Sequence, residues 1–183
     1  AQHRIRQDPD RAAVPCRIGV CGMKIAVVSG SFDPITAGHM DVVRIAAGIF
    51  DEVHVVIVAN GEKSHGIFSP ADRLRIAARA VQPYKNVCAA VHSGLLSDYC
   101  ASVGAKYLVR GVRNGTDFAY EYDLAAIMRR FDPELETVFL PAPPERACVS
   151  STYVRELLKY GCPLDGAVPD GCAALVRELY DAR

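Results

Sequence analysis

Short apolar runs alternate with stretches of helical periodicity along most of the chain. The runs are rich in valine, isoleucine and alanine, which is typical of strands covered on both faces. We expect strands at 25–28, 53–59, 86–91, 107–109 and 137–140. Apolar residues at helical spacing predict helices from residue 36 onward and at 69–81, 95–103, 117–130, 151–160 and 170–181. This alternation predicts an α/β fold, with a five-stranded parallel sheet and helices on both of its faces.

The composition narrows the classes of partner. The chain has 183 residues, of which half are apolar, as expected for a single domain with a sizeable core. Its 21 basic and 21 acidic residues balance, so no global basic surface points to nucleic acid. No apolar run approaches the ~20 residues that cross a bilayer, so no membrane partner is expected.

Residues 1–22 differ from the rest of the chain. They carry arginines without a hydrophobic period and lack the apolar core of a signal peptide. Met23 directly precedes the first strand, so we expect 1–22 to be an upstream extension without fixed structure and 23–183 to form the domain. The seven cysteines show no metal-binding spacing, which favours free thiols in a reducing cytoplasm and no metal site made by protein side chains.

The stretch from Lys24 to His39 combines a buried strand, a glycine loop and the start of a helix. The strand ends at Ser29-Gly30-Ser31, and Asp33-Pro34 makes a second turn before the helix. Free N–H groups and the positive end of the helix dipole form an anion site at such a junction. Taken alone, the stretch also fits a glycine turn followed by a helix-capping histidine.

Polar residues follow four of the predicted strands. Ligands bind beyond the carboxyl ends of parallel strands, so these residues are expected to meet in one pocket. They are Ser31 and His39 after the first strand, Lys63 after the second, Arg110 and Arg113 after the fourth, and Ser150, Ser151 and Thr152 after the fifth. Arginine pairs suit phosphate, although such loop cations and helix-capping hydroxyls also occur without a ligand. No role is assigned to His54, His65 or His92.

Three strings of the sequence resemble one family. Residues 30–39 read GSFDPITAGH, which contains a match to the (H/T)xGH signature of the nucleotidyltransferase superfamily. Residues 110–125 resemble the pattern RGxRxxxDFxYExxLA of the phosphopantetheine adenylyltransferases, and 149–155 resemble the superfamily's ISSTxxR motif. The resemblance runs from Met23 to nearly the end of the chain and implies a single-domain, Rossmann-like nucleotidyltransferase fold.

The resemblance implies transfer of the adenylyl group of ATP to 4′-phosphopantetheine, giving dephospho-coenzyme A and pyrophosphate. This is the penultimate step of coenzyme A synthesis, and it proceeds by direct in-line attack without a covalent enzyme intermediate. The resemblance further implies Mg²⁺ as the cofactor of ATP, a homohexamer, feedback inhibition by coenzyme A and a cytoplasmic location.

Residue roles follow from the same resemblance, with His39 as the stabiliser of the transition state. ATP is expected to contact Ser31, Phe32, His39, Gly111, Val112, Arg113, Glu121, Arg146, Ala147, Cys148, Val149, Ser150, Ser151 and Thr152. The acceptor 4′-phosphopantetheine is expected to contact Ser31, Lys63, Leu96 and Arg110.

Some positions depart from the family pattern. Ser31 replaces the usual threonine and keeps its hydroxyl, and Ala37 replaces a common asparagine. Met128 stands where asparagine is frequent, and Arg146 and Cys148 replace commoner aromatic residues. The last two changes bear on the adenine contacts and leave the phosphate chemistry unaffected.

Three other functions share parts of this pattern. A nucleotidyltransferase for nicotinamide mononucleotide or a phosphorylated alcohol shares the first and last motifs but lacks the string from Arg110 to Glu121. A nucleotide-binding sensor keeps the fold without turnover. A fragment related to class I aminoacyl-tRNA synthetases is disfavoured by the short chain, the neutral charge and the absence of a KMSKS-like segment.

Overall fold

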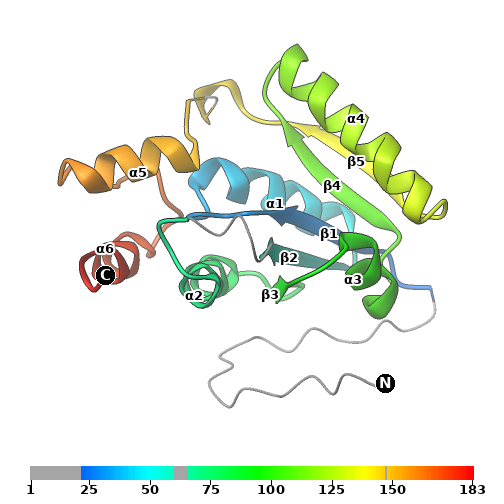
Figure 1. Ribbon diagram of the computed structural model, residues 1–183, viewed down its shortest axis with the longest axis horizontal. Helices are drawn as coiled ribbons and strands as arrows, with labels where there is room; N and C mark the ends of the chain where they lie inside the picture. The colour runs from blue at the N-terminus through cyan, green and yellow to red at the C-terminus, as the bar shows by residue number, and fades with distance from the viewer. Residues whose placement is uncertain (1–21, 60–65, 147) are drawn as a thin grey trace.

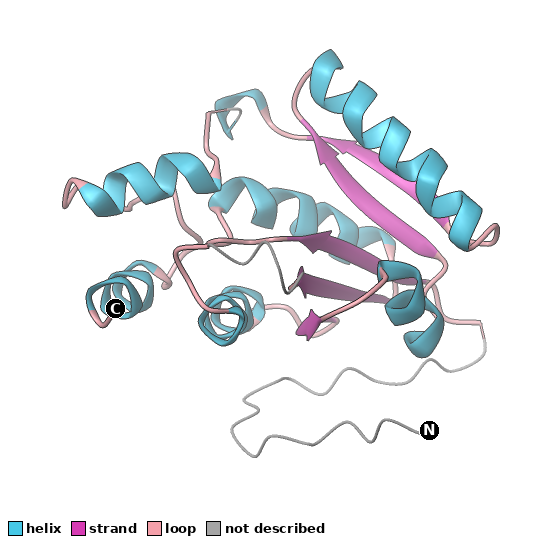
Figure 2. Cartoon of the chain, viewed as in Figure 1, coloured by secondary structure: helices cyan, strands magenta, loops and turns pink. Residues whose placement is uncertain are grey.

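A parallel sheet between two helical layers forms the centre of the computed structural model, which describes residues 22–59, 66–146 and 148–183 (Figures 1 and 2). The strands are β1 (Ile25–Gly30), β2 (Glu52–Val58), β3 (Val87–His92), β4 (Tyr107–Val112) and β5 (Glu136–Pro141). They lie in the order β3-β2-β1-β4-β5, and every neighbouring pair is parallel. The predicted α/β fold with a five-stranded parallel sheet is therefore confirmed.

Six α-helices and one short 3₁₀ helix connect and follow the strands in the described part of the chain. They are α1 (Ala37–Ile49), α2 (Pro70–Val81), α3 (Leu96–Val103), α4 (Gly115–Phe131), η1 (Pro144–Arg146), α5 (Ser151–Lys159) and α6 (Ala173–Asp181). The predicted start of α2 and the predicted C-terminal end of α3 are confirmed. Ser69 caps α2 with Pro70 in its first turn, and Gly104 ends α3 in a left-handed conformation at φ 72°.

Alternate residues of β1 point into two separate hydrophobic cores. Ala26 and Val28 belong to the larger core, which includes residues of α1, α2, α5 and α6. Ile25 and Val27 belong to a smaller core on the other face, which is closed by residues of α3 and by Met128 of α4. Burial on both faces explains why the strand sequences are continuous apolar runs. No helix among the described residues is long and apolar enough to cross a membrane.

The main difference from the expected elements is at β4. The sequence predicts a strand that ends at Val109, but β4 continues to Val112 because its last residues pair with β5. Arg110 is opposite Phe139 and Gly111 is opposite Leu140 in this register. Arg110 is therefore held on a strand rather than in a loop after it, which fixes the direction of its side chain.

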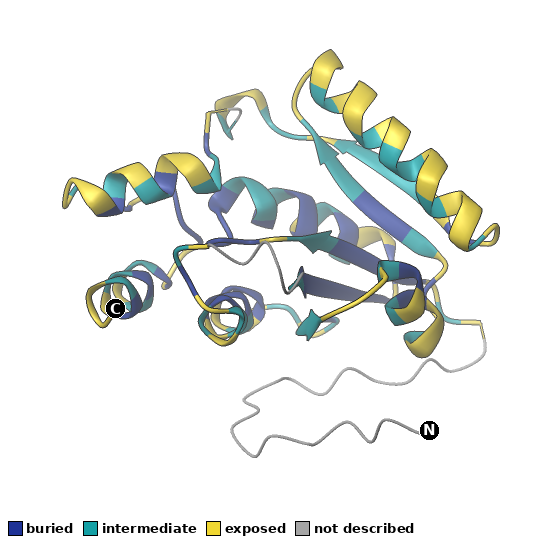
Figure 3. Cartoon of the chain, in the orientation of Figure 1, coloured by how far each residue is buried: buried dark blue, intermediate teal, exposed yellow. Residues whose placement is uncertain are grey.

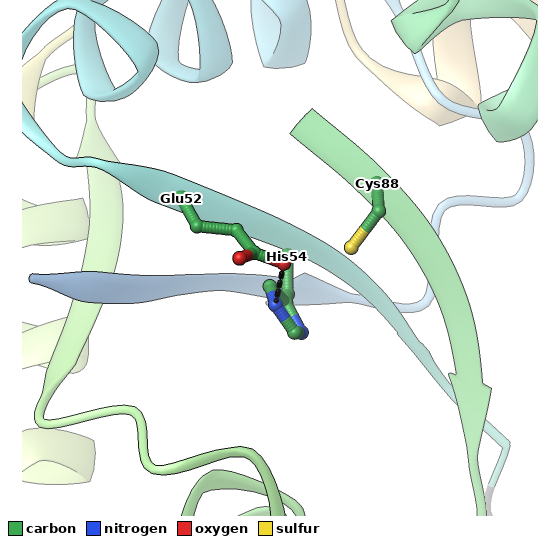
Figure 4. Close-up of side chains that lie close together, drawn as sticks. All are labelled: Glu52, His54 and Cys88. Carbon is green, nitrogen blue, oxygen red and sulfur yellow. Dashed lines mark hydrogen bonds and ion pairs between the residues drawn. The ribbon is translucent and has the colours of Figure 1, made fainter. Parts of the chain in front are cut away.

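A buried polar cluster lies beside the smaller core, in the first half of β2 and β3 and so away from the carboxyl ends of the strands. Figure 4 shows three of its side chains, Glu52, His54 and Cys88. His54 is on β2 and is buried; its Nε2 lies 3.0 Å from Oε1 of Glu52, and its Nδ1 lies 2.8 Å from the hydroxyl of Tyr99. An ionised carboxylate only accepts hydrogen bonds, so Nε2 carries the proton and Nδ1 accepts from the Tyr99 O–H. Burial lowers the pKa of His54, against the smaller opposing effect of Glu52, which agrees with a neutral ring.

This cluster corrects two expectations from the sequence. His54 does have partners, namely Glu52 and Tyr99. Cys88, which lies opposite His54 in the neighbouring strand, is disulfide-bonded rather than free, whereas Cys100, Cys148, Cys162 and Cys172 are free thiols. Glu52, His54 and Cys88 lie close enough to hold a metal ion, but the imidazole nitrogens and the sulfur are already engaged. We therefore assign this cluster to stability.

We expect Tyr99→Phe to lower the free energy of unfolding by about 1–3 kcal/mol, because it leaves a buried imidazole nitrogen without its donor. Urea unfolding measures the change. Tyr120→Phe is the matched control, since Tyr120 is exposed on α4. Equal unfolding free energies for the two variants would contradict the role of the Tyr99 hydroxyl.

Candidate active site

A polar cavity of about 220 Å³ opens beyond the carboxyl ends of β1 and β4, beside the first turn of α1. This is where ligands bind in sheets of this type. Eight of the predicted site residues line it: Ser31, Phe32, His39, Arg110, Gly111, Arg113, Glu121 and Arg146. The convergence of the first and second sequence motifs on one cavity is thereby confirmed.

His39 lies in the first turn of α1 and forms a capping box with Thr36. The backbone N–H of Thr36 donates to Nδ1 of His39 at 3.0 Å, and the N–H of His39 points back to the Thr36 hydroxyl at 3.4 Å. Because Nδ1 accepts from the backbone, the neutral ring carries its proton on Nε2. The edge of the imidazole also packs against Phe32, with ring centroids 5.1 Å apart.

The electrostatic environment keeps this imidazole neutral. Burial, and secondarily the positive charge of Arg113, lower the pKa of His39 to about 4. At neutral pH the side chain is therefore an uncharged hydrogen-bond donor through Nε2. Such a donor stabilises negative charge that develops on a phosphate oxygen without repelling the neighbouring arginine.

Arg110 is oriented by contacts that the sequence reasoning did not identify. Its Nε donates to the Glu121 carboxylate on α4, and its Nη1 donates to the carbonyl and the hydroxyl of Ser29 at 3.0 and 2.9 Å. The backbone N–H of Arg113 donates to Asp117, which is also on α4. Ser29 and Asp117 both line the cavity. Two features of the sequence could have identified them: Ser29 stands at the end of the first strand, and Asp117 is the acidic residue of the second motif.

An apolar cavity of about 140 Å³ adjoins the polar one and shares Arg110 and Glu121 with it. Leu96, Leu124 and Met128 contribute to its wall. Leu96, which is expected beside the pantetheine arm, thus lines an apolar cavity that meets the polar cavity at Arg110. Methionine at position 128 supplies flexible apolar lining.

Two glycines lie where elements around the cavity approach one another. A Cβ on Gly111 would lie 2.7 Å from a methyl group of Val42 on α1, and a Cβ on Gly38 would lie 3.4 Å from the carbonyl oxygen of Val149. Any larger residue at 111 would force β4 and α1 apart. The distance at Gly38 is an ordinary contact, so Gly111 is the position where glycine is needed, and it brings the second motif close to α1.

The hydroxyl groups of the third motif are engaged in structural contacts. Ser150 caps α5 by accepting from the N–H of Tyr153, and Ser151 donates to the carbonyl oxygen of Pro34 at 2.9 Å. Thr152 accepts from Arg155 at 2.8 Å. Several expected ATP contacts do not line the described cavity: Val112, Cys148, Val149, Ser150, Ser151 and Thr152. Lys63 and Ala147 lie outside the described residues.

Arg146 of η1 does line the cavity, and its side chain is held from two sides. Its Nε lies 3.5 Å from the Asp41 carboxylate on α1, and its Nη1 donates to the carbonyl oxygen of Gly166 at 2.6 Å. These contacts join the segment before α5 to α1. An arginine here gives the cavity wall a planar cationic surface.

We expect the His39 imidazole signals to stay at their neutral positions from pH 8 down to about pH 5 and to titrate near pH 4. The unfolded chain takes up this proton near pH 6.5, so His39 lowers stability progressively as the pH falls from about 6.5 to about 4. Heteronuclear NMR of imidazole-labelled protein, with His39→Gln for assignment, measures the midpoint. A midpoint near 6.5 would contradict a neutral His39.

Comparison with known proteins agrees with this geometry. Residues 27–157 match the cytidylyltransferase-like family. Over 158 residues the chain is 40% identical to a phosphopantetheine adenylyltransferase of Rubrobacter xylanophilus, covering 86% of this chain and 96% of the relative. Over 162 residues it is 41% identical to a phosphopantetheine adenylyltransferase of Bifidobacterium longum, covering 87% and 95%. The chain therefore belongs to the phosphopantetheine adenylyltransferase family.

Proposed function

We propose that this protein transfers the adenylyl group of ATP to 4′-phosphopantetheine and releases pyrophosphate and dephospho-coenzyme A. The observation that carries the proposal is the junction of two cavities at Arg110. The polar cavity suits a triphosphate and a phosphate acceptor, and the apolar one suits the arm of that acceptor. The names of the relatives at 40% and 41% identity point to the same reaction.

The chemistry needs no nucleophile from the protein. An oxygen of the acceptor phosphate, already anionic, attacks the α-phosphorus of ATP. The bond from that phosphorus to the bridging oxygen breaks on the opposite side, and the electron pair leaves with pyrophosphate. The protein contributes positioning and charge stabilisation, as in other phosphoryl transfers. The Nε2–H of His39 is the donor assigned to the α-phosphate in its transition state.

Positions in the two cavities support the remaining roles that we propose. Arg110 grips the acceptor phosphate at the junction, with Leu96 beside the pantetheine arm. Gly111, Arg113 and Arg146, which line the polar cavity, hold the nucleotide. The other nucleotide contacts expected from the sequence, and Lys63 for the acceptor, remain part of the proposal.

Magnesium fits this donor set as a companion of ATP. Asp117 and Glu121 are the carboxylates on the described wall of the polar cavity, and both already accept hydrogen bonds from arginines. Magnesium usually keeps several waters and is bound through one or two carboxylates together with substrate phosphates. Magnesium would therefore be held mainly by the triphosphate, with Asp117 available as a carboxylate on the cavity wall, and it would offset the charge of the leaving pyrophosphate.

A homohexamer and inhibition by coenzyme A belong to the same proposal. Support for assembly comes from α4, none of whose residues is buried (Figure 3). It exposes large apolar side chains on more than one side of the helix: Phe118, Tyr120, Tyr122, Ile127 and Phe131. Exposed apolar surface of this kind marks an interaction site. Glu121 of α4 also orients Arg110, so a subunit bound to α4 would lie next to a helix that positions an active-site residue.

We expect pyrophosphate release from ATP and Mg²⁺ to depend on added 4′-phosphopantetheine, because the acceptor phosphate is the attacking group. A coupled pyrophosphate assay measures it, with nicotinamide mononucleotide as the control acceptor. Release with the control acceptor alone would assign the protein to a different acceptor. ATP binding without release for either acceptor would support a nucleotide sensor.

We expect His39→Ala to lower kcat by about 10²–10³-fold with little change in ATP affinity, the scale of losing one transition-state donor. His39→Gln should recover part of the loss, because its amide N–H can donate without carrying a charge. Steady-state kinetics and calorimetric titration of ATP separate the two effects. Thermal unfolding measures the loss of the hydrogen bond from the Thr36 N–H to the imidazole. Wild-type turnover in His39→Ala would remove the assigned role.

A further inference from the structure

The turn formed by residues 31–34 lies between β1 and α1 and carries two of the proposed substrate contacts. Two of its carbonyl oxygens accept hydrogen bonds from arginines that come from other elements. Arg73 of α2 donates from Nη1 to the carbonyl of Ser31 at 3.3 Å, and Arg155 of α5 donates from Nη1 to the carbonyl of Asp33 at 2.9 Å. The turn is thus held by side chains from two sides of the fold.

The Asp33 side chain joins these two arginines. It is buried, and its oxygens lie 3.3 Å from Nε of Arg73 and 3.7 Å from Nη1 of Arg155. The same carboxylate accepts from the backbone N–H groups of Ile67 and Phe68, each at 2.9 Å. A buried carboxylate with this many donors has one strongly preferred position.

Arg73 is equally constrained. It is buried on α2, and its Nε also donates to the carbonyl oxygen of Phe68 at 2.8 Å. A Cβ on Gly66 would lie 1.6 Å from its Nη2, so glycine at 66 leaves the space that the guanidinium fills. A guanidinium makes several directed bonds at once, which a lysine ammonium at the same site does not reproduce.

The turn needs this support because Phe32 has a backbone φ of 43°, in the left-handed region that non-glycine residues rarely adopt. Such a conformation persists only where the surroundings determine it, and it occurs characteristically at functional sites. The Phe32 ring packs edge-on against His39 at 5.1 Å between centroids. A displaced turn would therefore move both Ser31 and the packing around His39.

We propose that Asp33, Arg73 and Arg155 form a positioning cluster that holds the 31–34 turn in the geometry required for adenylyl transfer. The proposal rests on the proposed function for its kinetic consequence, but the geometry of the turn can be tested without it. None of the three residues lines the polar cavity. They act through the Phe32 ring, which packs against His39, the donor assigned to the transition state, so the cluster governs turnover more than the affinity for either substrate.

Arg73→Lys is the central variant, because it keeps a positive charge beside the buried Asp33 and loses the directed bonds to the turn. Misplacement of reacting groups by about 1 Å costs up to ~10²-fold, so we expect kcat to fall by about 10–10²-fold. The KM values for ATP and phosphopantetheine should each stay within about 3-fold. Arg75→Lys is the control, since Arg75 lies on the same helix, is exposed and pairs only loosely with Asp72 at 3.8 Å.

NMR of the free protein gives a second readout. The His39 ring signals report the position of the Phe32 ring through its ring current, so Arg73→Lys should shift them and Arg75→Lys should not. Arg155→Lys, at a partly exposed site, should give a smaller effect of the same kind while leaving the core intact. The loss of kcat in the double variant should be smaller than the product of the two single losses, because both residues act on one turn.

The results separate two failures. A wild-type protein without phosphopantetheine-dependent pyrophosphate release refutes the proposed function, while the NMR comparison still tests the cluster. Unchanged His39 signals together with wild-type kcat in Arg73→Lys and Arg155→Lys overturn the cluster, and so does a loss confined to KM. Reduced kcat with stable KM values and shifted His39 signals supports it.

Discussion

The hydrogen bond from the Thr36 N–H to Nδ1 of His39 determines both where α1 begins and what His39 can do. It satisfies a backbone donor at the helix start, which is a matter of folding. It also leaves the ring proton on Nε2, which is a matter of chemistry. The same hydrogen bond therefore stabilises the start of α1 and fixes which nitrogen of the His39 ring carries the proton.

Close approach of elements is the second constraint on the site. Gly111 on β4 leaves room for Val42 of α1. The contact at Gly111 brings the first two motifs, which are far apart in sequence, around one cavity. The positioning cluster constrains the 31–34 turn in a similar way, because arginines of α2 and α5 bind its carbonyl groups and the side chain of its own Asp33.

The sequence predicted the sheet, the capped start of α2 and the meeting of the first two motifs, because these depend on local patterning and on the rule for strand ends. It missed the partners of His54 and the role of Ser29. Tyr99 reaches His54 from α3, and Ser29 meets Arg110 only because β1 and β4 are neighbours in the sheet, and neither arrangement can be read from the local sequence. It placed Arg110 in a loop, because the pairing of Arg110 with β5 is not visible in a single apolar run. The sequence of the third motif fits hydroxyls that cap a helix and hydroxyls that bind a ligand equally well. In the structure these hydroxyls contact other groups of the protein.

The charges around the cavity are more balanced than the row of arginines suggests. Arg110, Arg113 and Arg146 face Asp117 and Glu121 on the described wall, and Arg146 also lies beside Asp41. With a neutral His39, these carboxylates offset most of the positive charge of the three arginines at the cavity. A triphosphate gains instead from donors held in fixed directions, which favour the charge distribution of the transition state over any bound anion. Carboxylates and backbone carbonyls that hold Arg110 and Arg146 thus favour a fixed orientation over a strong net attraction for anions, and orientation is what an in-line transfer between two phosphates requires.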